Sequence, residues 1–315
     1  MNNKKFIIYF IGAAVCTLAL SFLLFQCDLS GSDNDVIRHY QMDKFETKVP
    51  SSTVLVVGDS SAGNAIDSIY FQELTGQPTE NVALTGSFGL PGTLEMMQAA
   101  VEKNPRLKNI IIIQTLDIWR RPFAKEGVFE LERGKHLGFW SPQFSRNPYI
   151  EYAEYASQLK NIFRALRSLV QTTPLARFIP ADAQIVRINA ESDYLQQEAL
   201  TYSNSGKILK GDEQLSAIID PKNLEVLYRI DVWCGEQHLN CLYLHGPLHE
   251  TVYQNSLFEV KEINAALRGA KYIQMFPQVL TFKNDKIGDS INHVALPFKK
   301  EATKEYYKMV KTYLH

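Results

Sequence analysis

The stretch Val54-Leu55-Val56-Val57-Gly58-Asp59-Ser60-Ser61 decides the fold that we expect for this chain. Four consecutive apolar residues, most of them β-branched, predict a buried strand. Glycine ends that strand, and apolar residues at four-residue spacing then predict one face of a helix: Ala62, Ile66, Tyr70 and Leu74. Ser60 is therefore expected where a strand ends and a helix begins, beside backbone N–H groups that have no partner within the helix.

A serine at such a junction has two interpretations. An Asp-Ser pair after a strand often serves only to cap the helix that follows. Alternatively, the serine is an exposed nucleophile beside backbone donors that can stabilise an oxyanion. The second interpretation requires a base elsewhere in the chain, and an acceptor that orients this base.

The alternation of strands and helices predicts an α/β fold with a mostly parallel sheet. Further buried strands are expected at 109–113, 240–244 and 271–275, and helices around 94–101, 221–236, 251–267 and 298–313. Residues 81–84 form a short strand or lead into the glycine-rich loop 85–92. Residues 119–215 break the alternation and are expected to form a mixed helical and loop insertion within a domain that spans 51–315.

Composition and charge exclude several classes of protein. The 315 residues have 45% hydrophobic content and a formal net charge of -1, which gives no electrostatic case for binding nucleic acid. No Cys-x-x-Cys spacing occurs and no histidine spacing is taken as support for a metal, so neither a metal site nor a cofactor is predicted. Cys234 and Cys241 either form a disulfide in an oxidising compartment or are two small apolar residues.

The first 28 residues are predicted to be an N-terminal membrane anchor. Lys4 and Lys5 precede 20 uncharged residues, 6–25, which is enough to cross the lipid core. Residues 29–50 read as a polar stalk. Positive charge before the span predicts a cytoplasmic N-terminus and an extracytoplasmic domain in contact with membrane lipid only through this helix. The alternative is a cleaved signal peptide, whose apolar region is usually shorter.

Among the seven histidines, His293 is the best candidate for the base. It lies in the turn-rich segment 288–294, and Asp289, four residues earlier, is placed to accept a hydrogen bond from its ring. The alternative is an ordinary loop in which Asp289 caps a turn. His245 and His249 follow a predicted strand, and they are either a ligand or catalytic pair or merely polar surface residues.

Gly58-Asp59-Ser60 resembles the first sequence block of the SGNH/GDSL hydrolase superfamily. Gly86, after residues 81–85, matches the second block, and Asp289 with His293 matches the C-terminal acid and base. The resemblance implies a three-layer α/β/α fold of the flavodoxin-like kind. It also implies that Ser60 is the nucleophile, that Asp289 and His293 activate it, and that the N–H groups of Ser60 and Gly86 form the oxyanion hole.

The chain departs from this family pattern at two places. The third block of the family usually carries an asparagine that donates to the oxyanion, whereas this chain has Gln114-Thr115-Leu116-Asp117. Either Gln114 or Thr115 replaces that donor, or the oxyanion hole is poorer, because an ionised Asp117 would repel the oxyanion. The acid and base are also one residue further apart than is typical, so the orienting acid is Asp289 or Asp285, or His293 acts without one.

The membrane-anchored layout resembles the bacterial cell-surface proteins that transfer or remove acyl groups on polysaccharides. This resemblance implies serine-dependent hydrolysis of an acyl ester, or transfer of an acetyl group, on an extracytoplasmic glycan. Some of these proteins work beside a multi-pass membrane acyltransferase, which is the partner expected by resemblance. The alternative function is a catalytically inactive scaffold or glycan-binding subunit of a complex that modifies a polymer.

Overall fold

The computed structural model describes residues 47–121, 213–216, 218–288 and 290–314, with residues 9, 12, 16, 41, 44 and 45 and the strand pairs 186–187 and 196–197. Most of the predicted anchor and stalk, and nearly all of the predicted insertion, lie outside these residues. A search of the described residues found no helix with the length and apolar character needed to cross a membrane.

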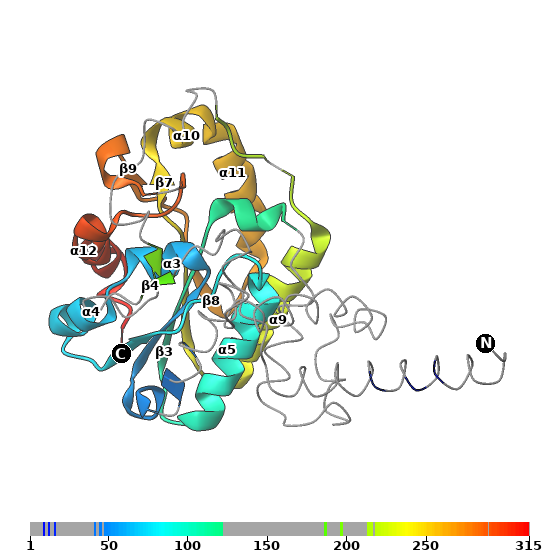
Figure 1. Ribbon diagram of the computed structural model, residues 1–315, viewed down its shortest axis with the longest axis vertical. Helices are drawn as coiled ribbons and strands as arrows, with labels where there is room; N and C mark the ends of the chain where they lie inside the picture. The colour runs from blue at the N-terminus through cyan, green and yellow to red at the C-terminus, as the bar shows by residue number, and fades with distance from the viewer. Residues whose placement is uncertain are drawn as a thin grey trace.

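Five parallel strands form the central sheet in the order β2-β1-β3-β6-β8 (Figure 1). Their bounds are Val54–Gly58 for β1, Thr79–Asn81 for β2, Asn109–Gln114 for β3, Asn240–His245 for β6 and Ile273–Phe276 for β8. Helices separate successive strands along the chain. The predicted α/β class with a mostly parallel sheet is therefore confirmed, and residues 82–84 lead into the loop instead of extending β2.

The central strands are buried because helices pack on both faces of the sheet. On one face, apolar residues of β1, β3 and β6 pack with α5 (Gly89–Lys103), α9 (Pro221–Glu236) and α11 (Leu257–Ala266). On the other face they pack with α3 (Ser60–Ala65), α4 (Ser68–Thr75) and α12 (Lys299–Val310). Every residue of β1 and β3 is buried, as expected for continuous apolar strands in a parallel sheet.

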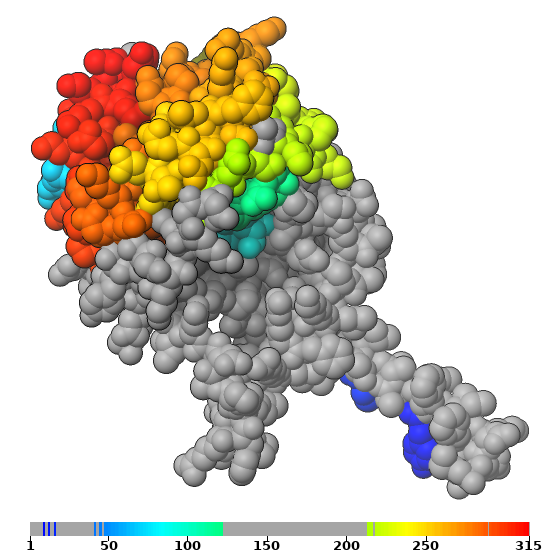
Figure 2. Space-filling model, turned by 90° about the horizontal axis from the view of Figure 1, so that it is seen from above, coloured from blue at the N-terminus to red at the C-terminus, as the bar shows by residue number. Residues whose placement is uncertain are grey.

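Short elements complete the described part of the chain. The C-terminal segments from β6 onward form much of the face seen in Figure 2, where they are coloured from yellow to red. The remaining elements are η1 (Val49–Ser51), η2 (Leu116–Trp119), β4 (Val186–Arg187), β5 (Gln196–Gln197), β7 (Leu248–His249), α10 (Glu250–Asn255), η7 (Leu267–Gly269), β9 (Thr281–Phe282), η8 (Asn284–Lys286) and η9 (Leu296–Phe298).

The single helix expected after Ser60 is wrong, because the chain forms two helices, α3 and α4, with Ile66 and Asp67 between them. The hydroxyl of Thr303 on α12 donates to the carbonyl of Ala65 at 3.0 Å and accepts from the N–H of Asp67 at 2.9 Å. The Asp67 side chain then caps α4 by accepting from Tyr70 N–H at 3.0 Å. A residue far along the chain thus supplies the bonds that a continuous helix would have made internally.

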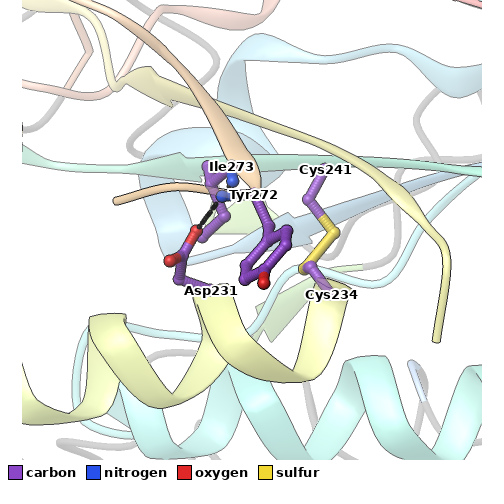
Figure 3. The surroundings of a disulfide bond; sticks show 5 residues. All are labelled: Asp231, Cys234, Cys241, Tyr272 and Ile273. Atoms are coloured by element: carbon purple, nitrogen blue, oxygen red, sulfur yellow. Dashed lines mark hydrogen bonds between the residues drawn. A yellow bond between two sulfur atoms is a disulfide. The ribbon is translucent and has the colours of Figure 1, made fainter. Parts of the chain in front are cut away.

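A disulfide joins Cys234 in the last turn of α9 to Cys241 in β6, which settles the two alternatives for these residues (Figure 3). Both cysteines are buried, and the ring of Tyr272 lies beside them. One turn earlier on α9, the Asp231 carboxylate accepts backbone hydrogen bonds from Lys271, Tyr272 and Ile273 at 2.7–2.9 Å. The C-terminal half of α9 is therefore attached to both β6 and β8.

Gly58 ends β1 in a conformation that a side chain would not tolerate. Its φ is +143°, and a Cβ built there would lie 1.8 Å from the carbonyl oxygen of Ile113 on β3. The next residue, Asp59, donates its N–H to the same oxygen at 3.3 Å. Glycine therefore allows β1 to turn into α3 while it stays in contact with β3.

We predict that Gly58→Ala lowers the free energy of unfolding by more than about 3 kcal/mol, because it adds a backbone clash to a strained φ. Gly76→Ala is the matched control, since Gly76 has a φ of +70° but open space around its Cβ position. That control should cost only about 1–2 kcal/mol. Urea unfolding followed by circular dichroism measures both values, and equal losses would contradict the proposed close approach.

We also predict that the double variant Cys234→Ala, Cys241→Ala loses about 2–3 kcal/mol of unfolding free energy, as expected for a disulfide that closes a short loop. A reducing agent should destabilise the wild-type protein by a similar amount and leave the double variant unchanged. Cys16→Ala, which removes a cysteine outside this disulfide, is the control and should keep the wild-type response. A wild-type protein that is insensitive to reduction in the unfolding assay would contradict the stabilising role.

Candidate functional site

Ser60 and His293 form the centre of the candidate site. The Oγ atom of Ser60 lies 2.8 Å from Nε2 of His293, although 233 residues separate them in the sequence. Ser60 is the first residue of α3, directly after the turn that ends β1, and both side chains are partly exposed. The structure therefore brings together the serine and the histidine that were predicted as nucleophile and base.

A short backbone ladder positions His293. Ile287 and Val294 form an antiparallel bridge, and the N–H of Gly288 donates to the carbonyl of His293 at 2.8 Å. The N–H of Ala295 donates to the carbonyl of Lys286 at 2.9 Å. Residues 286–288 thus pair with residues 293–295 directly before η9 and α12, and this pairing holds the histidine beside the start of α3.

The orienting acid is not defined by the described residues. Asp289 itself lies outside them, so its predicted contact with His293 stays a prediction. The alternative acid, Asp285, is an exposed residue of η8. The described part of the site therefore consists of a serine hydroxyl that is hydrogen-bonded to an imidazole. The group that orients this imidazole stays a prediction.

The buried Asp59 carboxylate fixes the chain on which Ser60 lies. It accepts from the N–H of Ser61 at 2.9 Å and from the N–H of Thr115 at 3.0 Å, and the Ser61 hydroxyl also donates to it. Ser61 is fully buried. The helix-capping interpretation therefore holds for Asp59, while Ser60 is the serine that faces the histidine. The bond to Thr115 was not predicted, because nothing local in the sequence indicates it.

Gly86 lies in the loop that follows β2, next to the end of β1. The N–H of Leu84 donates to the carbonyl of Gly58 at 2.9 Å, which keeps the start of this loop beside the turn that leads to Ser60. Further along, the N–H of Phe88 donates to the carbonyl of Thr85, and the N–H of Gly89 donates to the carbonyl of Gly86. The loop thus turns tightly around the predicted second oxyanion donor.

The two residues expected to replace the missing asparagine both make hydrogen bonds within the fold. The Gln114 amide is buried and donates to the hydroxyl of Thr93 on α5 at 2.6 Å. The backbone N–H of Thr115 is bonded to Asp59. Asp117 is nearly buried, but Arg120 and Arg121 both form ion pairs with it, which offsets the repulsion that its charge would cause.

The pair His245 and His249 does not form a site. His245 is buried at the end of β6, with Nε2 2.8 Å from Oδ1 of Asn264 on α11, and burial lowers its pKa to about 4. His249 accepts the Thr251 N–H on Nδ1 at 3.0 Å and bonds Asn284 through Nε2, so it caps α10. Across the part of the chain that the structure describes, no cluster of three or more potential ligand residues could hold a metal ion.

Comparisons with known proteins add no relative, because neither a protein-family model nor a curated protein matches this chain.

We predict that the unfolding free energy falls by about 3 kcal/mol between pH 6.5 and pH 4 through His245. Its pKa is about 4 in the fold against 6.5 for a free histidine, so the unfolded chain takes up a proton first as the pH falls. Above pH 6.5 both states are neutral at this ring and the contribution is constant.

His245→Gln should remove this part of the pH dependence, whereas His238→Gln, which changes an exposed histidine, should keep it. Urea unfolding at several pH values measures the slope for each protein. An unchanged slope in His245→Gln would show that another group carries the effect.

Proposed function

We propose that the protein catalyses serine-dependent chemistry on an acyl ester, either its hydrolysis or the transfer of its acyl group. The 2.8 Å contact between Ser60 Oγ and His293 Nε2 carries this proposal. A serine hydroxyl is a weak nucleophile until an adjacent base can take its proton, and the two atoms lie within the distance that such a transfer needs. Ser60 is also partly exposed, so a substrate can reach it.

The proposed mechanism has two halves. His293 takes the hydroxyl proton of Ser60 as its oxygen attacks the carbonyl carbon of the ester, and a tetrahedral oxyanion forms. The N–H groups of Ser60 and Gly86 stabilise this oxyanion, at about 3–4 kcal/mol per donor in well-studied sites. His293 then protonates the departing alcohol and leaves an acyl-enzyme. Water or a sugar hydroxyl, deprotonated by the same histidine, takes the acyl group and releases Ser60.

The fold supports the proposed place in the SGNH/GDSL superfamily. The strand order β2-β1-β3-β6-β8 is the order 2-1-3-4-5 of flavodoxin-like sheets, and helices cover both faces, as in a three-layer α/β/α domain. Ser60 lies at the carboxyl end of β1, the edge at which open α/β sheets bind their ligands. Residues 119–215 would then be an insertion after η2, and Asp289 would orient His293.

The proposed substrate is a glycan ester outside the cytoplasm, with residues 1–28 as a membrane anchor. The disulfide between Cys234 and Cys241 supports an oxidising compartment, since such bonds rarely persist in the cytosol. In this proposal the domain faces a cell-surface polymer and contacts lipid only through its anchor. It transfers acyl groups to that polymer or removes them from it, and a multi-pass membrane acyltransferase is its partner.

One observation favours the second candidate function, an inactive scaffold or glycan-binding subunit. The segment from Gln114 to Asp117 lacks the usual asparagine, and its amide and backbone donors are bonded within the fold. A site with a weakened oxyanion hole could retain the fold and bind a glycan without turning it over. Reactivity of Ser60 distinguishes this function from the first.

We predict that a fluorophosphonate probe labels the full-length protein at Ser60 and that the protein releases acetate from 4-nitrophenyl acetate at pH 7–8. Ser60→Ala should abolish both signals, and His293→Ala should lower both rates about 10²–10⁴-fold, because the base is lost. Ser51→Ala is the control and should still be labelled at Ser60, since Ser51 is an exposed serine of η1 that has no role in the proposed site. Peptide mass spectrometry identifies the labelled serine.

Absence of labelling in the folded wild-type protein would exclude the enzymatic proposal and favour the scaffold. Labelling that survives in Ser60→Ala would place the nucleophile elsewhere.

A further inference from the structure

We infer that Arg121 is a catalytic residue that donates a hydrogen bond to the oxyanion, in the role for which this chain has no asparagine. The inference rests on the proposed serine chemistry and adds a group that the resemblance does not supply. Its basis is the position of the Arg121 guanidinium, whose Nη1 lies 3.3 Å from the point where a Cβ on Gly86 would be, together with the ion pair that Arg121 forms with Asp117.

The topology of the sheet brings Arg121 to the reacting serine. β1 lies between β2 and β3, Gly86 follows β2, and Arg121 follows β3 and η2. A Cβ added to Gly86 would lie 3.3 Å from Nη1 of Arg121, the closest approach among the described residues. Two segments from either side of β1 thus come close to each other near its carboxyl end, which is where Ser60 begins α3.

Asp117 orients the guanidinium so that one nitrogen remains for the site. The carboxylate of Asp117 bonds Nε and Nη2 of Arg121, which form one edge of the planar group. Nη1 belongs to the other edge, and it is the atom that faces Gly86. The carboxylate therefore acts as a support for a donor, instead of repelling the oxyanion itself.

The local charge also favours an oxyanion. Arg120 and Arg121 both pair with Asp117, so two positive groups and one negative group leave a net charge of +1. The Asp117 side chain is 7% exposed, while those of Arg120 and Arg121 are 51% and 49% exposed. Of these two arginines, only Arg121 has an atom within 4 Å of the Cβ position of Gly86.

Arg121→Gln tests this inference against Arg120→Gln, which removes the other partner of the same carboxylate. We expect kcat for 4-nitrophenyl acetate to fall about 10²–10³-fold in Arg121→Gln, with KM changed less than about threefold, as for the loss of one oxyanion donor. In Arg120→Gln, kcat should fall less than about threefold. Arg121→Lys should recover part of the rate, because it keeps a cationic donor. Thermal unfolding verifies that each variant is folded.

A double-mutant cycle with Gly86→Ala gives a second measurement. The added methyl group would lie 3.3 Å from Nη1 and displace it, so Gly86→Ala should lower kcat less in the Arg121→Gln background than in the wild-type protein. Strict additivity of the two substitutions would contradict a role for Nη1 at this position.

The outcomes separate this inference from the proposed function. A wild-type protein that reacts with neither ester nor fluorophosphonate overturns both. Normal wild-type turnover with an unchanged kcat in Arg121→Gln overturns the inference alone. An increase in KM confined to negatively charged esters, at constant kcat, shows that Arg121 binds substrate and overturns its role at the oxyanion. Equal losses in Arg120→Gln and Arg121→Gln assign the effect to the structure around Asp117.

Discussion

The arrangement of the candidate site depends on the three hydrogen bonds that the Asp59 carboxylate accepts. Two come from Ser61 and cap the first turn of α3, and the third comes from the backbone of Thr115 at the end of β3. Because Asp59 is buried, these bonds form in a medium of low dielectric constant, where their loss would leave a charge without compensation. One side chain therefore fixes the start of the helix that carries the serine against the neighbouring strand, and it joins the serine to the segment that bears Asp117 and Arg121.

The C-terminal segment completes this arrangement from the same face of the sheet as α3. The hydroxyl of Thr303 bonds the backbone on both sides of the break between α3 and α4. The hydroxyl of Tyr306 donates to the carbonyl of His245 at 2.9 Å. Both residues belong to α12, and the turn that carries His293 precedes that helix. The position of the histidine relative to Ser60 is thus supported by bonds to the serine's own helix and to β6.

Sequence patterns predicted the parts of the fold that depend on local composition. The apolar runs of β1 and β3 are continuous because both faces of the sheet are covered. The helix 221–236 begins at Pro221, after Asp220 caps it. Both kinds of element can therefore be predicted from neighbouring residues alone. His293 was predicted from its turn-rich segment and the aspartate four residues before it, and the family resemblance then implied its role as the base. The break at Ile66–Asp67, the bond from Thr115 to Asp59 and the approach of Arg121 to Gly86 depend on partners distant in sequence. No local pattern could have indicated them.

The separation of Ser60 from His293 has a consequence for the order in which the molecule matures. Ser60 and β1 leave the ribosome early, whereas His293 follows Ser60 at a separation of 233 residues. The helix that supports the histidine is the last one in the described chain. Ser60 therefore lacks its hydrogen-bond partner until the turn that carries His293 and the helix after it have docked.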